Sequence, residues 1–384
     1  MFQLYGDGVR DDTAAIQQML DTRTAEVYLP APQNCYLISR TLKLHPGQTL
    51  RTAPTTRIRL ADDSNCAMLE NDDFDRYGED LCVDGGIWDM NNVAQEPNPW
   101  HFPGKDGLTS RQRLGWPVFG TDPNLTSLPA VYSGFCMRFC RVRRFTLKNV
   151  TFRNPVTYGV QIACAEDFTV RDIRFDYPLC NPKYWNMDGV HIEGHCKHGL
   201  ITNLKGTVHD DLVAITADDG LYGPIENIVV DGIWAENAHS AVRLLSHGLP
   251  VKNIVLRNIF GSYYTYCIGL TKYYGGPEER GDMRNILIEN VAACACPGTK
   301  DVGGGNHPLL WVQDGVDVDG LRIENVYREE RTYPTPLLRV DATAHVTHLH
   351  LDNIVQKNLL DAPVPFLQLD GPVDTLLQGY TQNS

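Results

Sequence analysis

A short phrase of alternating apolar and polar residues recurs along the chain. Each copy places apolar residues two positions apart, then Asn, Asp or Gly, then another apolar residue, as in FTLKNV at residues 145–150. Further copies lie at 81–87, 168–173, 228–233, 254–259, 286–291, 321–326 and 349–354, with a weaker one from Leu200. The alternation predicts strands with one buried face, and the Asn, Asp or Gly predicts a bend into another short strand.

The spacing of these copies predicts a solenoid. From Phe145 on, successive copies begin 23, 32, 28, 26, 32, 35 and 28 residues apart. Strands at this period, without a helical phase, are typical of the coils of a parallel β-solenoid. A β-propeller needs four strands per repeat, leucine-rich repeats need their Leu and Asn consensus, and βα units need amphipathic helices, which we do not find after residue 25. We predict an all-β fold in which residues 1–384 form one single-stranded right-handed parallel β-helix.

The two ends of the chain and one interruption of the repeat also fit a solenoid. Residues 12–20 begin with a capping Asp or Thr and place apolar residues at helical spacing, so a short helix within 1–25 is expected to cover the first coil. Residues 91–132 are rich in Pro, Gly and Trp and predict a long loop insertion that lines a site. Residues 361–384 carry no clear repeat, and we expect a loose C-terminal tail.

Composition narrows the class of function. The net charge of −13 argues against nucleic acid or a membrane surface as partner, because both are polyanionic. No run of 18 apolar residues is present to span a bilayer. Eleven cysteines without CxxC pairs predict reduced thiols. With no apolar signal region after Met1, we expect a cytoplasmic protein or, alternatively, a secreted or periplasmic one whose signal peptide has been removed.

A second strand in each coil carries the candidate chemistry. Aligned on their apolar pairs, these strands begin at Tyr158, Asp188, Asp211, Ser240 and Tyr266. In this register Asp188 and Asp211 take the same place in successive coils, about 4.8 Å apart along the axis. Asp210 is next to Asp211, so the alignment predicts three carboxylates in one patch.

Three crowded carboxylates repel one another when ionised. At least one is therefore expected to have a raised pKa and to stay protonated near neutrality. A protonated acid beside ionised bases is what cleavage of a glycosidic bond requires. The alternative, that each Asp only caps a turn at a coil corner, is weaker for three residues in register than for one.

Two groups of motifs resemble known families. Residues 5–17, YGDGVRDDTAAIQ, are similar to the start shared by β-helices of the pectate lyase superfamily, including polygalacturonases and phage tailspikes. Residues 186–189, NMDG, resemble the Asn-Thr-Asp-Gly motif of family 28 glycoside hydrolases. Residues 210–215, DDLVAI, resemble that family's Asp-Asp-x-Ile-Ala-Ile motif. The likeness covers most of the chain.

This resemblance implies roles for the three aspartates. Asp210 would be the general acid, and Asp188 and Asp211 would position and deprotonate the attacking water. The resemblance also implies inversion at the anomeric centre, whereas carboxylates at roughly 5 Å favour retention. Neither a metal nor a cofactor is expected. We predict a glycoside hydrolase that acts on a pectic or related poly- or oligosaccharide.

Departures from the family pattern leave the substrate open. The expected Gly-His-Gly is Ala-His-Ser here, so His239 is one residue out of step, and His209 is a second candidate for the supporting histidine. The Arg-Ile-Lys motif that grips a uronate is absent at residues 269–271. Arg243, one coil earlier, either pairs with a uronate or holds an active-site Asp, and Lys272 is close by.

Further residues are expected to bind the sugar. Asn186 belongs to the first Asp motif, His191 points outward on the same wall, and Tyr266 and Trp311 lie in coils after the Asp pair. Aromatic faces stack on sugar rings, so these positions predict a substrate cleft. The insertion at 91–132 would block one end of that cleft and make the enzyme exo-acting.

Two other classes fit the same scaffold. A β-elimination lyase would need calcium and a Lys or Arg base, and its unsaturated product would absorb in the ultraviolet. A non-catalytic or tailspike-like protein would bind glycans as a trimer. We expect a carbohydrate-binding monomer with turnover, which would exclude the trimeric adhesin.

Overall fold

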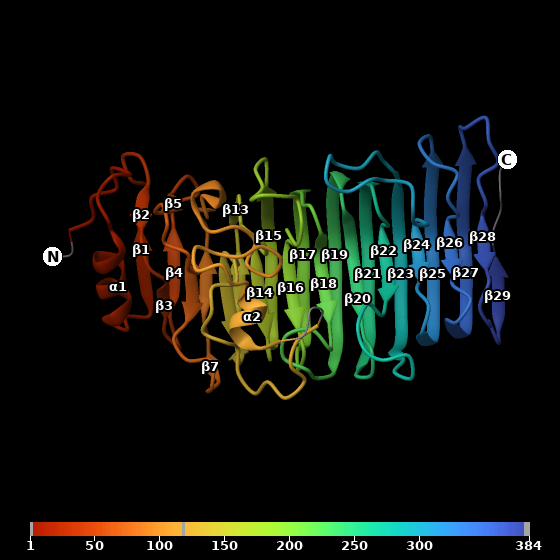
Figure 1. Ribbon diagram of the computed structural model, residues 1–384, viewed down its shortest axis with the longest axis horizontal. Coiled ribbons are helices and arrows are strands. Elements are labelled where there is room, and N and C mark those ends of the chain that lie inside the picture. The colour runs from red at the N-terminus through yellow and green to blue at the C-terminus, as the bar shows by residue number, and fades with distance from the viewer. Residues whose placement is uncertain (1–2, 117–119, 380–384) are drawn as a thin grey trace.

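The structure, a computed structural model, describes residues 3–116 and 120–379 and forms one long stack of coils (Figure 1). Parallel strands pair in register from coil to coil, as in a right-handed parallel β-helix, which confirms the predicted fold. The strands of each coil contribute to two sheets, called here the narrow and the wide sheet.

The narrow sheet carries one short strand from each coil. Within the described residues its strands are β3 (Leu42–Leu44), β6 (Leu69–Asn71), β10 (Met137–Cys140), β14 (Val160–Ala163), β16 (Val190–Glu193), β18 (Asp211–Thr216), β20 (Ser240–Leu245), β22 (Ile268–Thr271), β24 (Leu310–Val312), β26 (Leu338–Val340) and β28 (Leu367–Leu369). Its buried column of Val160, Val190, Val213, Val242 and Ile268 faces the core.

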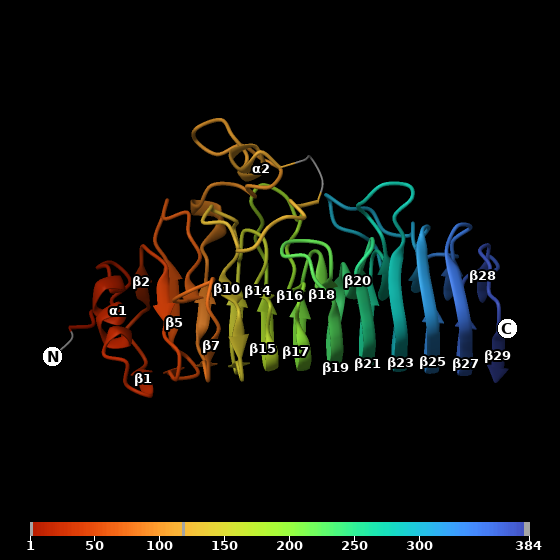
Figure 2. The same cartoon turned by 90° about the horizontal axis from the view of Figure 1, so that it is seen from below.

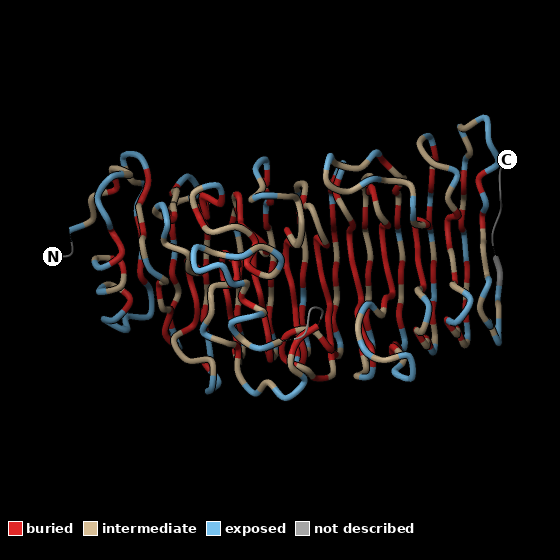
Figure 3. The backbone as a smooth tube through the Cα atoms, in the orientation of Figure 1, coloured by how far each residue is buried: buried red, intermediate tan, exposed pale blue. Residues whose placement is uncertain are grey.

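The wide sheet contains the recurring phrase of the sequence. Within the described residues its strands are β1 (Glu26–Leu29), β2 (Tyr36–Ile38), β4 (Thr49–Thr52), β5 (Arg57–Leu60), β7 (Gly78–Glu79), β8 (Cys82–Asp84), β9 (Ile87–Asp89), β11 (Val142–Arg143), β12 (Thr146–Lys148), β13 (Thr151–Arg153), β15 (Glu166–Asp176), β17 (Lys197–Thr207), β19 (Ile225–Ala238), β21 (Pro250–Tyr263), β23 (Gly281–Ala295), β25 (Val316–Glu330), β27 (His345–Asn358) and β29 (Leu376–Gly379). Buried residues alternate with exposed ones along these strands (Figure 3).

The predicted mid-phrase bends are left-handed backbone positions. Asn258 and Asn290 have φ values of 58° and 55°, a region that Asn tolerates better than most residues. The side-chain amide of Asn290 donates to Asn258, which donates to Asp231. Asn353 donates to Asn325 in the same way. These ladders explain why Asn recurs at the bend, because it fits the backbone and bonds the next coil.

The N-terminal helix α1 (Thr13–Asp21) covers the first coil as predicted, and it buries Ile16 and Leu20 completely. Asp12 occupies the N-cap position but does not cap with its side chain. Its carboxylate accepts hydrogen bonds from the backbone amides of Tyr5 and Gly6 instead. Asp12 therefore holds the entering segment of chain. Residues 1–2 of the predicted cap lie outside the described residues.

The chain between β9 and β10 contains the predicted insertion and has two short helical segments, η1 (Asn92–Ala94) and α2 (Ser110–Leu114). Figure 2 shows the part with α2 projecting from the stack of strands. Neither α1, with nine residues, nor α2, with five, is long and apolar enough to cross a membrane, and no other helix among the described residues is. Residues 117–119 of the insertion lie outside the description.

The expectation of a loose tail at 361–384 was wrong for residues 361–379. Strand β28 pairs with β26, and β29 pairs with β27, so this segment adds a further coil. Its strands are short, and their apolar residues Leu367, Leu369 and Leu376 are too sparse to repeat the sequence phrase. Residues 380–384 lie outside the described residues.

Candidate active site

Adjacent coils of the narrow sheet bring the predicted aspartates together. Val190 pairs with Val213, so Asp188 and Asp211 take the same place on neighbouring coils, in the register expected from the sequence. A side chain at Gly189 would bring its Cβ to 2.5 Å from the Leu212 carbonyl oxygen. The glycine after Asp188 therefore permits this close approach of the two coils.

Asp211 is a buried carboxylate with three partners. Its Oδ2 lies 2.5 Å from Nε of Arg243. The Ser240 hydroxyl donates to Oδ1, and the Tyr266 hydroxyl donates to the same oxygen over 3.3 Å. An ion pair with added hydrogen bonds offsets the loss of hydration on burial. Of the two contacts left open for Arg243, the structure shows the one with an aspartate, Asp211.

Asp210 is the most exposed of the three aspartates. It lies on the bend before β18, its side chain is 24% exposed, and its Oδ1 lies 3.7 Å from Nδ1 of His239. Burial is the main cause that raises the pKa of Asp210 to about 7. A carboxyl with such a pKa can carry a proton near neutrality and remain within reach of a ligand.

Asp188 is almost completely buried. Burial, and then the neighbouring Asp211, raise its pKa well above the ordinary value. Its Oδ2 lies 2.9 Å from Nδ1 of His191. Neither Asp188 nor Asp211 reaches solvent appreciably, so the implied contact of both carboxyls with an attacking water does not exist in this conformation.

Three of the four candidate histidine and lysine residues have partners within the protein away from Asp210. His191 was expected to face the cleft but is completely buried, and burial lowers its pKa to about 4. His209 packs against the Tyr184 ring at 4.0 Å, and burial lowers its pKa to about 4 as well. The Lys272 ammonium donates to the carbonyl of Gly276. The fourth candidate, His239, lies beside Asp210.

The aromatic candidates form a group on the C-terminal side of the aspartates. The rings of Tyr266 and Trp311 are 5.7 Å apart, and those of Trp311 and His307 are 4.6 Å apart. The Trp311 indole donates to Asp341, and the residue is only 6% exposed. Trp311 therefore offers little free ring face, while Tyr266 acts on the site through its bond to Asp211.

A cavity of about 370 Å³ lies between the insertion and the narrow sheet. Residues from the insertion, the sheet and two later loops line it: Trp100, His101, Arg111, Trp116, Thr121, Leu125, Leu128, Pro129, Val131, Ser133, Phe135, Arg138, Tyr158, Gln161, Asn186, Glu193, Asp219, Gly220, Tyr273 and Tyr274. Asn186, which lines the cavity, lies two residues before Asp188 in the sequence. The aspartates at 188, 210 and 211 are not among the described lining residues.

A stack of aromatic rings runs from the insertion to the aspartates. Trp116 stacks on Trp100 at 5.8 Å, and Trp100 on Phe135 at 6.0 Å. Phe135 stacks on Tyr158 at 4.3 Å, and Tyr158 on His191 at 4.2 Å. The insertion is therefore packed, ring by ring, against the residue that contacts Asp188.

Polar groups lie deep in the same cavity. Gln161 donates to Glu193 over 2.6 Å and accepts from the Arg138 guanidinium over 3.1 Å. Burial raises the pKa of Glu193 to about 8, so this carboxyl is mainly protonated at neutral pH. The cavity thus combines aromatic faces with a few polar groups, as small-molecule sites commonly do.

The sequence reasoning did not identify Tyr158, Gln161 or Glu193 as site residues. Tyr158 takes the place of Asp188 one coil earlier, and Gln161 pairs with His191. The alignment of second strands already contained both positions. The missing signal was the packing of the insertion over them, which no local pattern specifies.

Two groups of side chains among the described residues could in principle hold a cation. Asp210, Asp211 and His239 each offer an atom, and these atoms lie within 4.8 Å of one another. Arg243 already pairs with Asp211, and its charge would repel a second cation there. These residues therefore fit acid–base chemistry better than metal binding.

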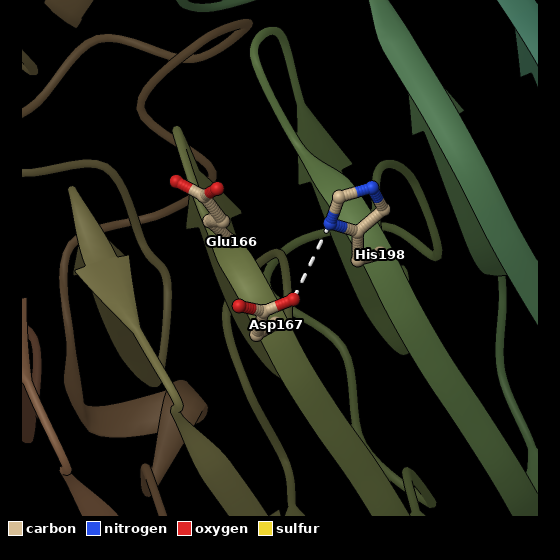
Figure 4. Close-up of side chains that lie close together, drawn as sticks. All are labelled: Glu166, Asp167 and His198. Carbon is tan, nitrogen blue, oxygen red and sulfur yellow. Dashed lines mark ion pairs between the residues drawn. The ribbon is translucent and has the colours of Figure 1, made fainter.

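The second group lies on the wide sheet. Figure 4 shows Glu166, Asp167 and His198, in which the Asp167 carboxylate and His198 are 3.3 Å apart. Asp167 and His198 are exposed, and Glu166 already pairs with Arg143 and Lys197. This surface cluster has its own partners and does not indicate a site.

No known family profile matches the sequence, and no curated protein matches it. Solved structures share the fold along nearly the whole chain. The exopolygalacturonase of Thermotoga maritima is 16% identical, with a TM-score of 0.67 over 98% of this chain and 90% of that chain. A mannuronan C-5 epimerase module of Azotobacter vinelandii is 14% identical, with a TM-score of 0.57 over 100% and 98%. A surface adhesin of Streptococcus pneumoniae is 16% identical, with a TM-score of 0.52 over 100% and 98%.

Identities this low show a common fold. The scaffold is shared by a pectin hydrolase, an epimerase and an adhesin, and fold alone therefore does not assign an activity.

Proposed function

We propose that this protein is a glycoside hydrolase that cleaves glycosidic bonds in a pectic or related poly- or oligosaccharide. The observation that carries the proposal is Asp210, an accessible carboxyl with a pKa raised to about 7, next to the buried, ion-paired Asp211. Asp210 is the general acid that protonates the leaving oxygen. A carboxylic acid with a raised pKa beside a carboxylate held in place is the pairing that this reaction uses.

The burial of Asp211 supports water as the nucleophile. Direct attack on the anomeric carbon would need an exposed carboxylate, whereas Asp211 is completely covered by Arg243, Ser240 and Tyr266. Asp211 is the base, and the water takes the place of the Tyr266 hydroxyl, its longest contact at 3.3 Å, while Arg243 and Ser240 keep the anomeric carbon out of reach. We propose an inverting reaction, which proton NMR of the first anomer released would test.

The cavity supports exo action. The insertion contributes Trp100, Arg111 and Thr121 to the lining of the cavity. A chain end fits such a space, while a continuous polymer would have to pass through the insertion. Small products released from the start of the reaction are expected, and mid-chain fragments appearing first would contradict exo action.

Other features favour hydrolysis over elimination. A lyase needs a basic side chain that is able to remove a proton from the sugar. Arg243 is committed to Asp211, and the Lys272 ammonium to the Gly276 carbonyl. Both reactions create new reducing ends, but only elimination leaves a C4–C5 double bond at the new non-reducing end. Product that absorbs in the ultraviolet would therefore replace the hydrolase proposal with a lyase.

The direct test is Asp210→Asn, assayed by the release of reducing ends from pectic fragments and aryl glycosides. Loss of a general acid is expected to lower the rate by about 10²- to 10⁴-fold. Asp167→Asn is the matched control, because Asp167 is an exposed carboxylate on the wide sheet. An unchanged rate in Asp210→Asn would remove Asp210 from the mechanism.

A further inference from the structure

A buried chain of hydrogen-bonding groups runs from Asp188 across two coils. Nδ1 of His191 lies 2.9 Å from Oδ2 of Asp188, and Nε2 lies 3.1 Å from the Thr216 hydroxyl. That hydroxyl has two carbonyl acceptors, Ile192 at 3.2 Å and Asp219 at 3.5 Å. His191 and Thr216 are completely buried.

The two carbonyl acceptors of the Thr216 hydroxyl decide which group donates and which accepts in every hydrogen bond from Thr216 back to Asp188. When the Thr216 hydroxyl donates to a carbonyl, its oxygen must accept from Nε2–H of His191. A neutral imidazole with a proton on Nε2 has none on Nδ1, so Nδ1 accepts. The remaining partner, Asp188, must then donate, and a carboxyl donates only when it is protonated.

We propose that Asp188 is a neutral carboxylic acid, held and oriented by His191, and that it donates a hydrogen bond instead of acting as a base. His191 is then a positioning residue that never touches substrate. The consequence for catalysis rests on the proposed hydrolase function, and it leaves Asp211 as the one carboxylate that activates water.

The surroundings of Asp188 support the neutral form. An ionised buried carboxylate is ordinarily stabilised by several donors, whereas among the described residues the Asp188 side chain has one side-chain partner, His191. The Tyr177 hydroxyl donates to the main-chain carbonyl of Asp188 instead. The charged and titratable groups that face Asp188 and His191 are Asp210, Asp211, Asp219, Arg243, Tyr158 and Tyr177.

These neighbouring groups do not reverse the preference of Asp188 for its neutral form. Asp211 and Asp219 disfavour a further negative charge at Asp188, and Arg243, which favours it, is paired with Asp211. The Tyr158 ring, stacked on His191, excludes water from the imidazole. Burial accordingly raises the pKa of Asp188 well above its usual value and lowers that of His191 to about 4, and both directions agree with the neutral pair that the hydrogen bonds require.

Amide replacement separates a neutral donor from a base. In Asp188→Asn, the amide can still donate to Nδ1 of His191, and activity is expected to fall by at most about tenfold. In Asp211→Asn, loss of the base is expected to lower the rate by about 10²- to 10⁴-fold. The activity of Asp188→Ala, whose side chain cannot donate a hydrogen bond, is expected to be well below that of Asp188→Asn. Equal, severe losses in both amide variants would overturn the proposal.

The pH profile adds a readout that a structural role alone would not change. A neutral Asp188 gives Asp210 no neighbouring charge, so Asp188→Asn is expected to leave the alkaline limb of the rate profile in place. If Asp188 were ionised, removing its charge would lower the pKa of Asp210 and move that limb to lower pH.

A measurement on the unmodified protein decides the point without turnover. With ¹⁵N-labelled histidine, long-range proton–nitrogen NMR at neutral pH is expected to show His191 with its proton on Nε2, assigned by its absence from His191→Gln. His198→Gln, an exposed histidine, is the control. A proton on Nδ1 would overturn the neutral acid, whereas a protein with this tautomer but without glycan hydrolysis would refute only the proposed function.

Discussion

Nε of Arg243 lies 2.5 Å from Oδ2 of Asp211, across adjacent coils of the narrow sheet, and both side chains are at least nine-tenths buried. The pair answers a question that the sequence left open, because the Arg243 guanidinium contacts the Asp211 carboxylate inside the protein. It also makes the site dependent on both residues, since removing one leaves the other buried and uncompensated.

Arg243→Met is therefore expected to destabilise the protein by about 3–5 kcal/mol, the usual cost of breaking a buried ion pair. Urea unfolding followed by circular dichroism measures the change. In Arg243→Met/Asp211→Asn no buried charge remains unpaired, so part of the stability is expected to return. Arg257→Met breaks a pair with Asp231 on the more exposed wide sheet and is expected to cost about 1 kcal/mol or less. Similar losses of stability in Arg243→Met and Arg257→Met would contradict this account.

Most of the fold could be predicted from the sequence because each coil is determined by a short segment of that sequence. Alternating residues and a left-handed Asn such as Asn290 recur in coil after coil, and each copy alone indicates a bent strand. The last described coil was missed because its apolar residues, such as Leu367, are few. Its pairing with β26 follows from the coil before it and not from its own pattern.

The site could be predicted only in part. The register that aligns Asp188 with Asp211 follows from strand periodicity and is observed. Burial does not follow from periodicity, and His191, expected to face the cleft, lies beneath Tyr158. An outward position in a strand is open only if no loop covers it, and the packing of the insertion is a tertiary property that the local pattern does not contain.

The alkaline limb of the rate profile is expected to report on Asp210. The protonated form is the active acid, so activity is lost as pH rises through the pKa of Asp210, which burial raises to about 7. His239 is 3.7 Å away and lowers that pKa. His239→Gln is therefore expected to move the alkaline limb to higher pH.

Measuring kcat against pH for wild type and His239→Gln tests this expectation. His198→Gln, on the wide sheet, serves as control and should leave the limb unmoved. A limb that moved to lower pH in His239→Gln would show that His239 does not act on Asp210 through its charge.

Trp100 is expected to govern binding more than chemistry. Its ring packs between Trp116 and Phe135 and lines the cavity, some distance along the stack from Asp188. A ring that lines the cavity away from the aspartates contributes to ligand binding and not to proton transfer, so Trp100→Ala is expected to raise KM by about tenfold and to change kcat little. Trp234→Ala, exposed on the wide sheet, is the matched control. A fall in kcat at unchanged KM would place Trp100 in the chemical step.

Glu193 is expected to make the protein less stable as pH rises. Burial raises its folded pKa from 4.5 to about 8, so between these values the folded state binds more protons than the unfolded state. Stability is then greatest below about pH 4.5 for this group and is lost progressively up to about pH 8, by about 1.4 kcal/mol per pH unit and on the order of 5 kcal/mol in all.

Glu193→Gln removes the titration and keeps a neutral side chain that accepts from Gln161. Urea midpoints measured from about pH 5 to about pH 9 are expected to fall less steeply in Glu193→Gln than in wild type. The exposed Glu236→Gln controls for the loss of a carboxylate and should retain the wild-type slope. Parallel slopes for wild type and Glu193→Gln would mean that Glu193 ionises inside the fold without cost, and the polar part of the cavity would then carry a negative charge at neutral pH.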